Sequence, residues 1–187
     1  MALRGVLAQE IHHRVKNNLQ TVASLLRLQA RAEGVDPGKA LGDSVNRILA
    51  IAAVHEELTE HREDVVDLTE LVDRLRAMVV QGLVAGKEVT AELTPVELAG
   101  QRATALALVF SEVLSNALEH GGSTVTIRLW REGSDAVLSI ADDGQGMRGA
   151  SDGTGLSIVR ALVRDELGGS LELSSEAGLR VDVRFPA

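Results

Sequence analysis

The sequence contains no cysteine, which excludes a disulfide framework, a thiolate metal site and a cysteine nucleophile. Aromatic residues make up only 2% of the chain, too few for a base-stacking platform or for the aromatic belt of a membrane protein. No uninterrupted apolar run approaches membrane-spanning length, and the segment from Met1 to Gln9 does not resemble a signal peptide. We therefore expect a soluble, cytoplasmic protein with no membrane segment in this chain.

Positive charge is also scarce. The chain has 19 lysines and arginines against 27 aspartates and glutamates, which gives a formal net charge of −8 and a pI of about 5.1. An acidic chain of this kind is unsuited to direct binding of nucleic acid or of an anionic membrane. Hydrophobic residues make up 45% of the 187 positions, enough for one large or two small domains with true cores.

Two long helical patterns fill the first third of the chain. Residues 2–32 are predicted to form one helix, the segment 34–38 breaks it, and a second pattern runs from about residue 39 to 61. The apolar face of the second pattern is formed by Leu41, Val45, Ile48, Ala52 and Leu58. The two helices predict an antiparallel hairpin over residues 1–64. Because a hairpin alone cannot cover both apolar faces, we expect a homodimer that forms a four-helix bundle.

The first helix carries two adjacent histidines. At about 100° per residue, its buried stripe is formed by Ile11, Val15, Leu19, Val22 and Leu26. His13 and Asn17 each lie roughly 160° from the middle of that stripe and point into solvent, whereas His12 lies roughly 60° away and flanks it. A neutral imidazole displayed on a rigid helix is a usable nucleophile, although a lone exposed histidine more often belongs to an ordinary solvated face.

The helical period lapses over residues 62–66, and a second domain is predicted over residues 65–187. Asp67 is the expected N-cap of a new helix that runs to about Leu83. Further helices are expected over 101–120 and 155–167, and strands over 89–93, 124–130, 136–141, 170–174 and 179–185. The mixed order and the tight turns between strands predict an α+β sandwich rather than a doubly wound sheet.

A polar line runs along the predicted helix over 101–120. Glu112, Asn116 and His120 are spaced four apart and therefore lie on one side of an otherwise apolar helix. An asparagine oxygen suits Mg²⁺ and can bridge phosphates, and a glutamate can orient a proton or accept it. The alternative interpretation is an ordinary solvent-facing polar stripe.

Two glycine-rich segments follow. Asp142, Gly144 and Gly146 come directly after a strand, where an aspartate can accept a hydrogen bond from the exocyclic amine of adenine and glycines allow close backbone approach. Gly153 and Gly155-Leu156 open the next helix, whose free N–H groups can hold phosphate. Either segment alone is also ordinary turn chemistry, but the order of an Asn-bearing helix and then both segments is hard to obtain by accident.

In these motifs, residues 101–187 resemble the ATP-binding domain shared by histidine kinases, type II topoisomerases, the ninety-kilodalton chaperones and mismatch-repair ATPases, the Bergerat or GHKL fold. The matching positions are Glu112 and Asn116 in the N box, Asp142, Gly144 and Gly146 in the first glycine box, and Gly153 and Gly155 in the second. The stretch 12–20 resembles the H-R-x-x-N phosphoacceptor hairpin of one subclass of two-component sensor histidine kinases. The segments 25–30 and 54–56 look closest to actinobacterial kinases of the PdtaS type. The expected fold is thus a helical hairpin followed by an α+β Bergerat-type domain.

The resemblance implies a role for each site residue. His13 would accept the phosphoryl group, with His12 as its rival, and Glu112 would polarise or deprotonate the acceptor. Asp142 would read adenine, and the glycines with Leu156 and His120 would line the ATP site. Asn116 would bind the Mg²⁺ that spans the triphosphate. The phosphohistidine would then pass its group to an aspartate on the receiver domain of a response regulator.

Three other functions stay open at this stage. Only Met147 to Asp152 separate the two glycine boxes, whereas related domains carry a longer lid, so the chain could bind ATP as a signalling scaffold with little transfer. An anti-sigma serine kinase would share the ATPase fold but lack the N-terminal hairpin. A dedicated phosphatase is disfavoured because Arg14, rather than an acidic residue, follows His13.

Overall fold

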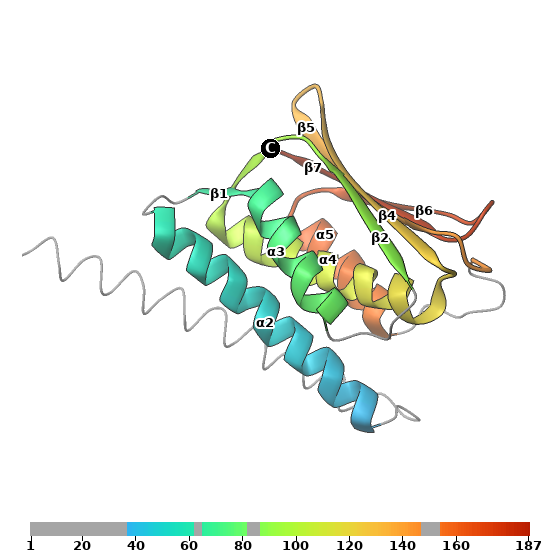
Figure 1. Ribbon diagram of the computed structural model, residues 1–187. Helices are drawn as coiled ribbons and strands as arrows, with labels where there is room; N and C mark the ends of the chain where they lie inside the picture. The colour runs from blue at the N-terminus through green and yellow to red at the C-terminus, as the bar shows by residue number, and fades with distance from the viewer. Residues whose placement is uncertain (1–36, 62–64, 82–86, 147–153) are drawn as a thin grey trace, which may run out of the picture.

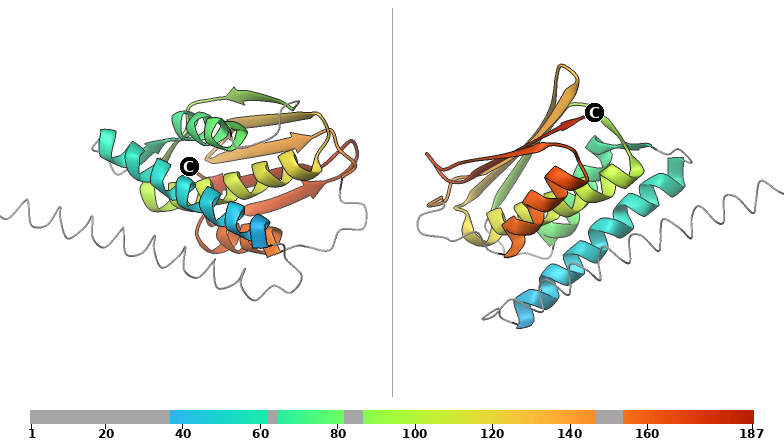
Figure 2. Two further views of the ribbon diagram at one scale, coloured as in Figure 1. Left: turned by 60° about the horizontal axis from the view of Figure 1, so that its bottom comes forward. Right: turned by 180° about the vertical axis from the view of Figure 1, so that it is seen from behind.

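The computed structural model describes residues 37–61, 65–81, 87–146 and 154–187, and these form three layers. A five-stranded sheet forms one layer, helices α3, α4 and α5 cover one of its faces, and α2 lies on the side of those helices that faces away from the sheet (Figure 1, Figure 2). The predicted helix over 2–32, which includes His12 and His13, lies outside the described residues, as does Gly153. None of the described helices is long and apolar enough to cross a membrane.

The main sheet has the strand order β2-β4-β5-β7-β6. Its strands are β2 (Glu88–Leu93), β4 (Thr124–Glu132), β5 (Asp135–Asp142), β7 (Arg180–Pro186) and β6 (Ser170–Ser174). The β2–β4 pair is parallel and the other three pairs are antiparallel. Every strand predicted from alternation is present, and the mixed sheet with helices on one face confirms the α+β sandwich.

A second, two-stranded sheet was not predicted. Strands β1 (Val65–Asp67) and β3 (Glu97–Ala99) pair antiparallel beside the helical layer. Both strands have three residues, too few for an alternating pattern to stand out from a loop. Residues 65 and 66 therefore belong to a strand and not to the boundary segment that the sequence predicts.

Helix α4 (Gly100–His120) forms the middle of the core. Its residues are buried almost all round, including Leu106, Phe110 and Leu114, because the sheet covers one side, α2 covers the opposite side, and α3 and α5 lie beside it. Helix α3 (Leu68–Gln81) begins as expected at Asp67, whose Oδ1 accepts 2.7 Å hydrogen bonds from the backbone N–H and the hydroxyl of Thr69. Helix α5 (Thr154–Asp165) completes the layer.

Helix α2 (Pro37–His61) has two apolar faces, and the structure buries the one that the sequence pattern did not single out. Ala50, Ala53 and Val54 are fully buried against the rest of the protein, whereas Leu41, Val45 and Ile48 are exposed. Ala52 is also exposed and Leu58 is half-buried. Small side chains let α2 approach α4 and α3 closely, and the larger apolar residues remain on the outer face.

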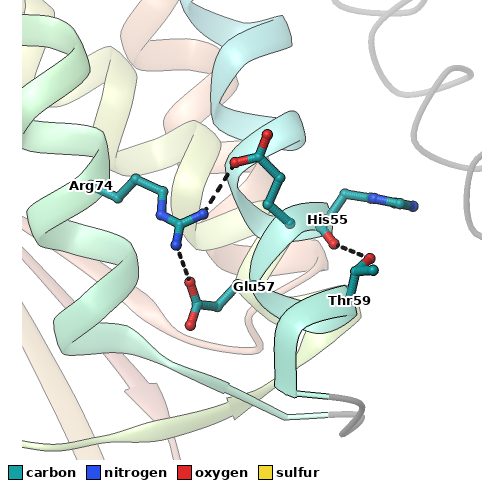
Figure 3. Close-up of polar contacts among 5 residues, drawn as sticks. His55, Glu57, Thr59 and Arg74 are labelled. Carbon is teal, nitrogen blue, oxygen red and sulfur yellow. Dashed lines mark hydrogen bonds and ion pairs between the residues drawn. The ribbon is translucent and has the colours of Figure 1, made fainter.

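An ion-pair cluster fastens α2 to α3. Arg74 on α3 places Nη1 3.1 Å from Glu56 Oε2 and Nη2 3.2 Å from Glu57 Oε2 (Figure 3). The Glu57 side chain is only 1% exposed, so the guanidinium of Arg74 compensates a charge that is nearly inaccessible to water. His55 points away from Arg74, and its backbone carbonyl accepts a hydrogen bond from the Thr59 hydroxyl at 2.7 Å (Figure 3).

Candidate functional site

Asp142 ends strand β5 with a carboxylate that the backbone holds in one orientation. Its Oδ1 accepts hydrogen bonds from Gly144 N at 2.8 Å and Leu179 N at 3.4 Å, and its own N–H donates to the Leu179 carbonyl at 2.9 Å. The residue is buried, with 9% of its surface exposed. These bonds occupy Oδ1, so Oδ2 is the oxygen suited to accept a hydrogen bond from a ligand.

Three glycine-containing segments meet around Asp142. A Cβ built on Gly144 would lie 2.8 Å from the Cα of Gly121, just after α4, and one built on Gly146 would overlap the Ser175 hydroxyl. A Cβ on Gly178, in the turn between β6 and β7, would overlap the Asp142 carbonyl oxygen. The sequence predicted Gly144 and Gly146 as site residues but missed Gly121 and Gly178, because only the fold brings those segments together.

Unlike Asp142, Asp143 uses both carboxylate oxygens in hydrogen bonds within the protein. Its Oδ1 accepts from the Thr124 N–H at 2.8 Å and its Oδ2 from the Ser123 hydroxyl at 3.0 Å. The bond from Thr124 lowers the pKa of Asp143 below its ordinary value of 3.8, and the Ser123 hydroxyl adds to this effect. Asp143 thus ties the loop after β5 to the start of β4. At the same end of α4, Lys87 Nζ donates to the Gly121 carbonyl at 3.0 Å.

A second cluster forms around Glu112, in the middle of α4. Arg47 on α2 donates to Glu112 Oε2 from Nη2 at 2.8 Å and from Nε at 3.3 Å. The two side chains are 6% and 12% exposed, so the ion pair is largely shielded from water. A Cβ built on Gly155 would overlap Glu112 Oε1, which places the other carboxylate oxygen against the N-terminal turn of α5. Glu112 is therefore held from two sides.

The predicted polar line on α4 is graded from buried to exposed. Glu112 is almost covered, Asn116 is half-buried one turn later, and the His120 side chain is 70% exposed at the helix end. The line is therefore not the ordinary solvent-facing stripe that was its alternative interpretation. Leu156, beside Gly155 on α5, is half-buried.

The two clusters are connected by a single rigid element. Glu112 and Gly121 are nine positions apart on and just beyond α4, a separation of about 14 Å along a helix. The structure thus places the Asp142 carboxylate at one end of α4 and Glu112 with the N-terminus of α5 nearer its middle. Such an arrangement suits a long ligand with a hydrogen-bonding ring at one end and anionic groups at the other.

Arg47 is the charged residue that the sequence analysis missed. A signal was present, since Arg47, Ala50, Val54 and Glu57 recur at helical spacing and so share one face of α2. An arginine and a glutamate on a face otherwise made of small apolar residues indicate buried ion pairs. The pattern cannot say which residues of another element complete those pairs.

Comparison with known proteins adds two family matches. Residues 10–83 match the family described as histidine kinase, and residues 101–187 match the histidine kinase-, DNA gyrase B- and HSP90-like ATPase family. Over 95% of its length the chain is 41% identical to the sensor histidine kinase PdtaS of Mycobacterium tuberculosis and 30% identical to the blue-light-activated histidine kinase 2 of Erythrobacter litoralis. It spans only 39% and 56%, respectively, of the lengths of these two proteins.

A solved structure agrees in fold. The histidine kinase domain of the Erythrobacter litoralis EL346 blue-light-activated histidine kinase superposes with a TM-score of 0.75. The superposition covers 95% of this chain and 89% of that domain, at 24% sequence identity. It therefore includes both α2 and the layers that carry the two clusters.

Proposed function

The chain belongs to the histidine kinase family, and we propose that it is an ATP-dependent protein-histidine kinase core that phosphorylates its own His13. The observation that carries the proposal is the placement of Glu112 against the N-terminus of α5, on the same helix whose far end packs against Asp142. Residues 1–64 would form the dimerising phosphotransfer hairpin and residues 65–187 the catalytic ATP-binding domain.

The Asp142 end would bind adenine. Because Oδ1 is held by two backbone N–H groups, Oδ2 would accept the hydrogen bond from the exocyclic amine of the base. The same oxygen would repel the carbonyl that guanine carries at that position, which favours ATP over GTP. Gly144 and Gly146 would allow the base to lie close to the backbone.

The Gly155 end would bind the triphosphate. Backbone N–H groups at Gly153, Gly155 and Leu156 would donate to phosphate oxygens, as the first turn of a helix favours anions. Asn116 is half-buried one turn from Glu112, and its neutral amide oxygen fits Mg²⁺, which would neutralise charge on the triphosphate when bound. His120 would lie toward the adenine end of the same helix.

Phosphoryl transfer would require mainly positioning. The unprotonated ring nitrogen of His13 attacks the γ-phosphorus, the bond to the bridging β–γ oxygen breaks, and ADP leaves with that electron pair. Glu112 polarises the N–H of the other ring nitrogen and takes its proton. The phosphohistidine then transfers its group to an aspartate on the receiver domain of a response regulator.

The experiment is incubation with γ-labelled ATP and Mg²⁺. The native chain and His12→Gln should acquire acid-labile, base-stable label, whereas His13→Gln should bind a fluorescent ATP analogue normally and remain unlabelled. Asn116→Ala should lose label because the metal is lost. Label retained in His13→Gln and lost in His12→Gln would move the acceptor to His12.

The same labelling assay distinguishes the kinase from the alternative function, an ATP-binding scaffold. Nucleotide binding without label in any chain would select the ATP-binding scaffold. The short segment from Met147 to Asp152, which was the reason for that alternative, lies outside the described residues.

A further inference from the structure

The ion pair between Arg47 and Glu112 joins two parts of the chain that belong to different family matches. Arg47 lies within residues 10–83 and Glu112 within residues 101–187. Oε2 of Glu112 receives both Nη2, at 2.8 Å, and Nε, at 3.3 Å, of the same guanidinium. A charge-assisted contact of this kind, with both side chains nearly covered, resists replacement by water.

The ion pair with Arg47 occupies the Glu112 carboxylate, which the proposed reaction needs to accept a proton. A carboxylate that takes a proton from an imidazole must present an oxygen to the ring N–H at hydrogen-bond distance. Oε2 is engaged by Arg47, and Oε1 faces Gly155 at the start of α5. With only 12% of the side chain exposed, the Glu112 carboxylate offers little surface to an incoming imidazole while the ion pair is formed.

Helix α2 does not depend on Arg47 alone for its place. Ala50, Ala53 and Val54 are buried, and Arg74 ties Glu56 and Glu57 to α3. The Arg47–Glu112 pair can therefore open while the rest of the α2 contact persists. A separable polar contact on an otherwise packed helix has the properties of a two-state element.

We propose that Arg47 is an autoinhibitory latch: its guanidinium on α2 holds the Glu112 carboxylate away from the phosphoacceptor, and phosphorylation requires that this ion pair be broken. The inference rests on the proposed function of Glu112 as the group that polarises or deprotonates the histidine. An input that shifts α2 along or away from α4 would act on phosphorylation through this one contact.

The latch and a purely positioning role predict opposite effects of removing Arg47 on the rate of phosphorylation. If Arg47 oriented Glu112 for catalysis, its removal would lower the rate of phosphorylation. If it restrains Glu112, removal raises that rate. The distinguishing variants are Arg47→Gln, which removes the charge, and Arg47→Lys, which keeps the charge but cannot donate from both Nε and Nη2.

The first measurement is the initial rate of acid-labile labelling at saturating Mg-ATP. We expect Arg47→Gln to be at least about fivefold faster than the native chain and Arg47→Lys to be intermediate. The matched control is Arg128→Gln, which removes an arginine from the exposed ion pair with Glu92 on the sheet and leaves the contacts of α2 intact, and its rate should stay within about twofold of native. A slower Arg47→Gln chain that still binds ATP, or equal acceleration by Arg128→Gln, would overturn the latch.

The second measurement does not depend on phosphorylation. Because the chain has no cysteine, spin labels can be placed selectively on cysteines introduced at Gly42 on α2 and Gln101 on α4, both exposed. Arg47→Gln should broaden the distance distribution between these labels, and Arg128→Gln should leave it unchanged. If no chain is labelled by ATP, the proposed function fails and the latch fails with it. If the native chain is labelled, a broadened distribution in Arg47→Gln supports the latch and an unchanged distribution refutes it.

Discussion

Gly178 lies directly on the backbone of Asp142. A Cβ at Gly178 would overlap the Asp142 carbonyl oxygen, and Gly178 has φ of +102°, in the region that favours glycine. The turn between β6 and β7 thus supports the loop whose carboxylate we propose to read adenine. Its neighbour Leu179 completes the support with backbone hydrogen bonds in both directions.

Replacement of Gly178 by alanine should therefore damage nucleotide binding. The Asp142 carbonyl must move to make room, and we expect the affinity for ATP to fall at least about tenfold, which is about 1.4 kcal/mol. Calorimetric titration measures this loss. Gly133→Ala is the matched control, because Gly133 also has positive φ but has no neighbour within 4 Å of an added Cβ. That variant should lose about 1 kcal/mol of stability and bind ATP normally. Equal affinities of the two variants would contradict the supporting role of Gly178.

Asp143 should make stability depend on acid pH. Its folded-state pKa lies below 3.8, so the hydrogen bond from Thr124 stabilises the folded chain above that pH. The stabilisation is lost as the pH falls through the lowered pKa and the carboxylate is protonated. Urea unfolding of the native chain and of Asp143→Asn between pH 7 and pH 3 measures the difference. The two stability curves should converge below pH 3.8, and curves that remain parallel would refute the assignment.

Removal of Arg74 should take a compensating charge away from the buried Glu57 carboxylate. We expect Arg74→Leu to lower the free energy of unfolding by on the order of 2–4 kcal/mol, because the Glu57 carboxylate is nearly inaccessible to water. Urea denaturation provides the measurement, and Glu57→Leu combined with Arg74→Leu should recover much of the loss. The control is Arg128→Leu, since the Arg128–Glu92 pair is exposed on both sides and should contribute less than about 1 kcal/mol. Similar losses in the two single variants would show that Glu57 needs no compensation.

The outer face of α2 should mediate self-association. Leu41 and Ile48 are 67% and 50% exposed on a helix whose other face is already packed. We propose that a second copy of the chain covers this face, so the native chain should be a dimer in light scattering at micromolar concentration. Leu41→Gln with Ile48→Gln should be a monomer with unchanged helical content. Val80→Gln, at an exposed apolar position on α3, should remain dimeric, and a monomeric native chain would exclude this interface.

Local patterns accounted for most of the elements that the structure describes. The helices α2 to α5 and the strands β2, β4, β5, β6 and β7 follow from periodicity, breakers and the Asp67 cap, all of which act over a few residues. The two three-residue strands β1 and β3 were missed because so short a segment carries no detectable period. His12, His13, Gly153 and the first helix lie outside the described residues, so their expected roles remain predictions.

The features of the site likewise divide into those that local spacing predicts and those that only the fold determines. Glu112, Asn116, Asp142 and the glycines could be proposed from the sequence because their spacing on one helix and after one strand is a local property. The graded exposure of the α4 polar line could not be predicted from the sequence, since it depends on which neighbours cover each turn of the helix. Burial is set by the whole fold, and a helical wheel gives only the relative directions of the side chains.

By itself, the sequence determined the elements, the order of the motifs and the absence of cysteine chemistry, because each of these is carried by neighbouring residues. Only the tertiary structure decided that Arg47 pairs with Glu112, 65 positions away, and that Leu179 supports Asp142, 37 positions away. It also decided which face of α2 is buried. Such choices depend on how complete elements pack against one another, and the free energy of that packing is distributed over the whole core rather than written in any single stretch.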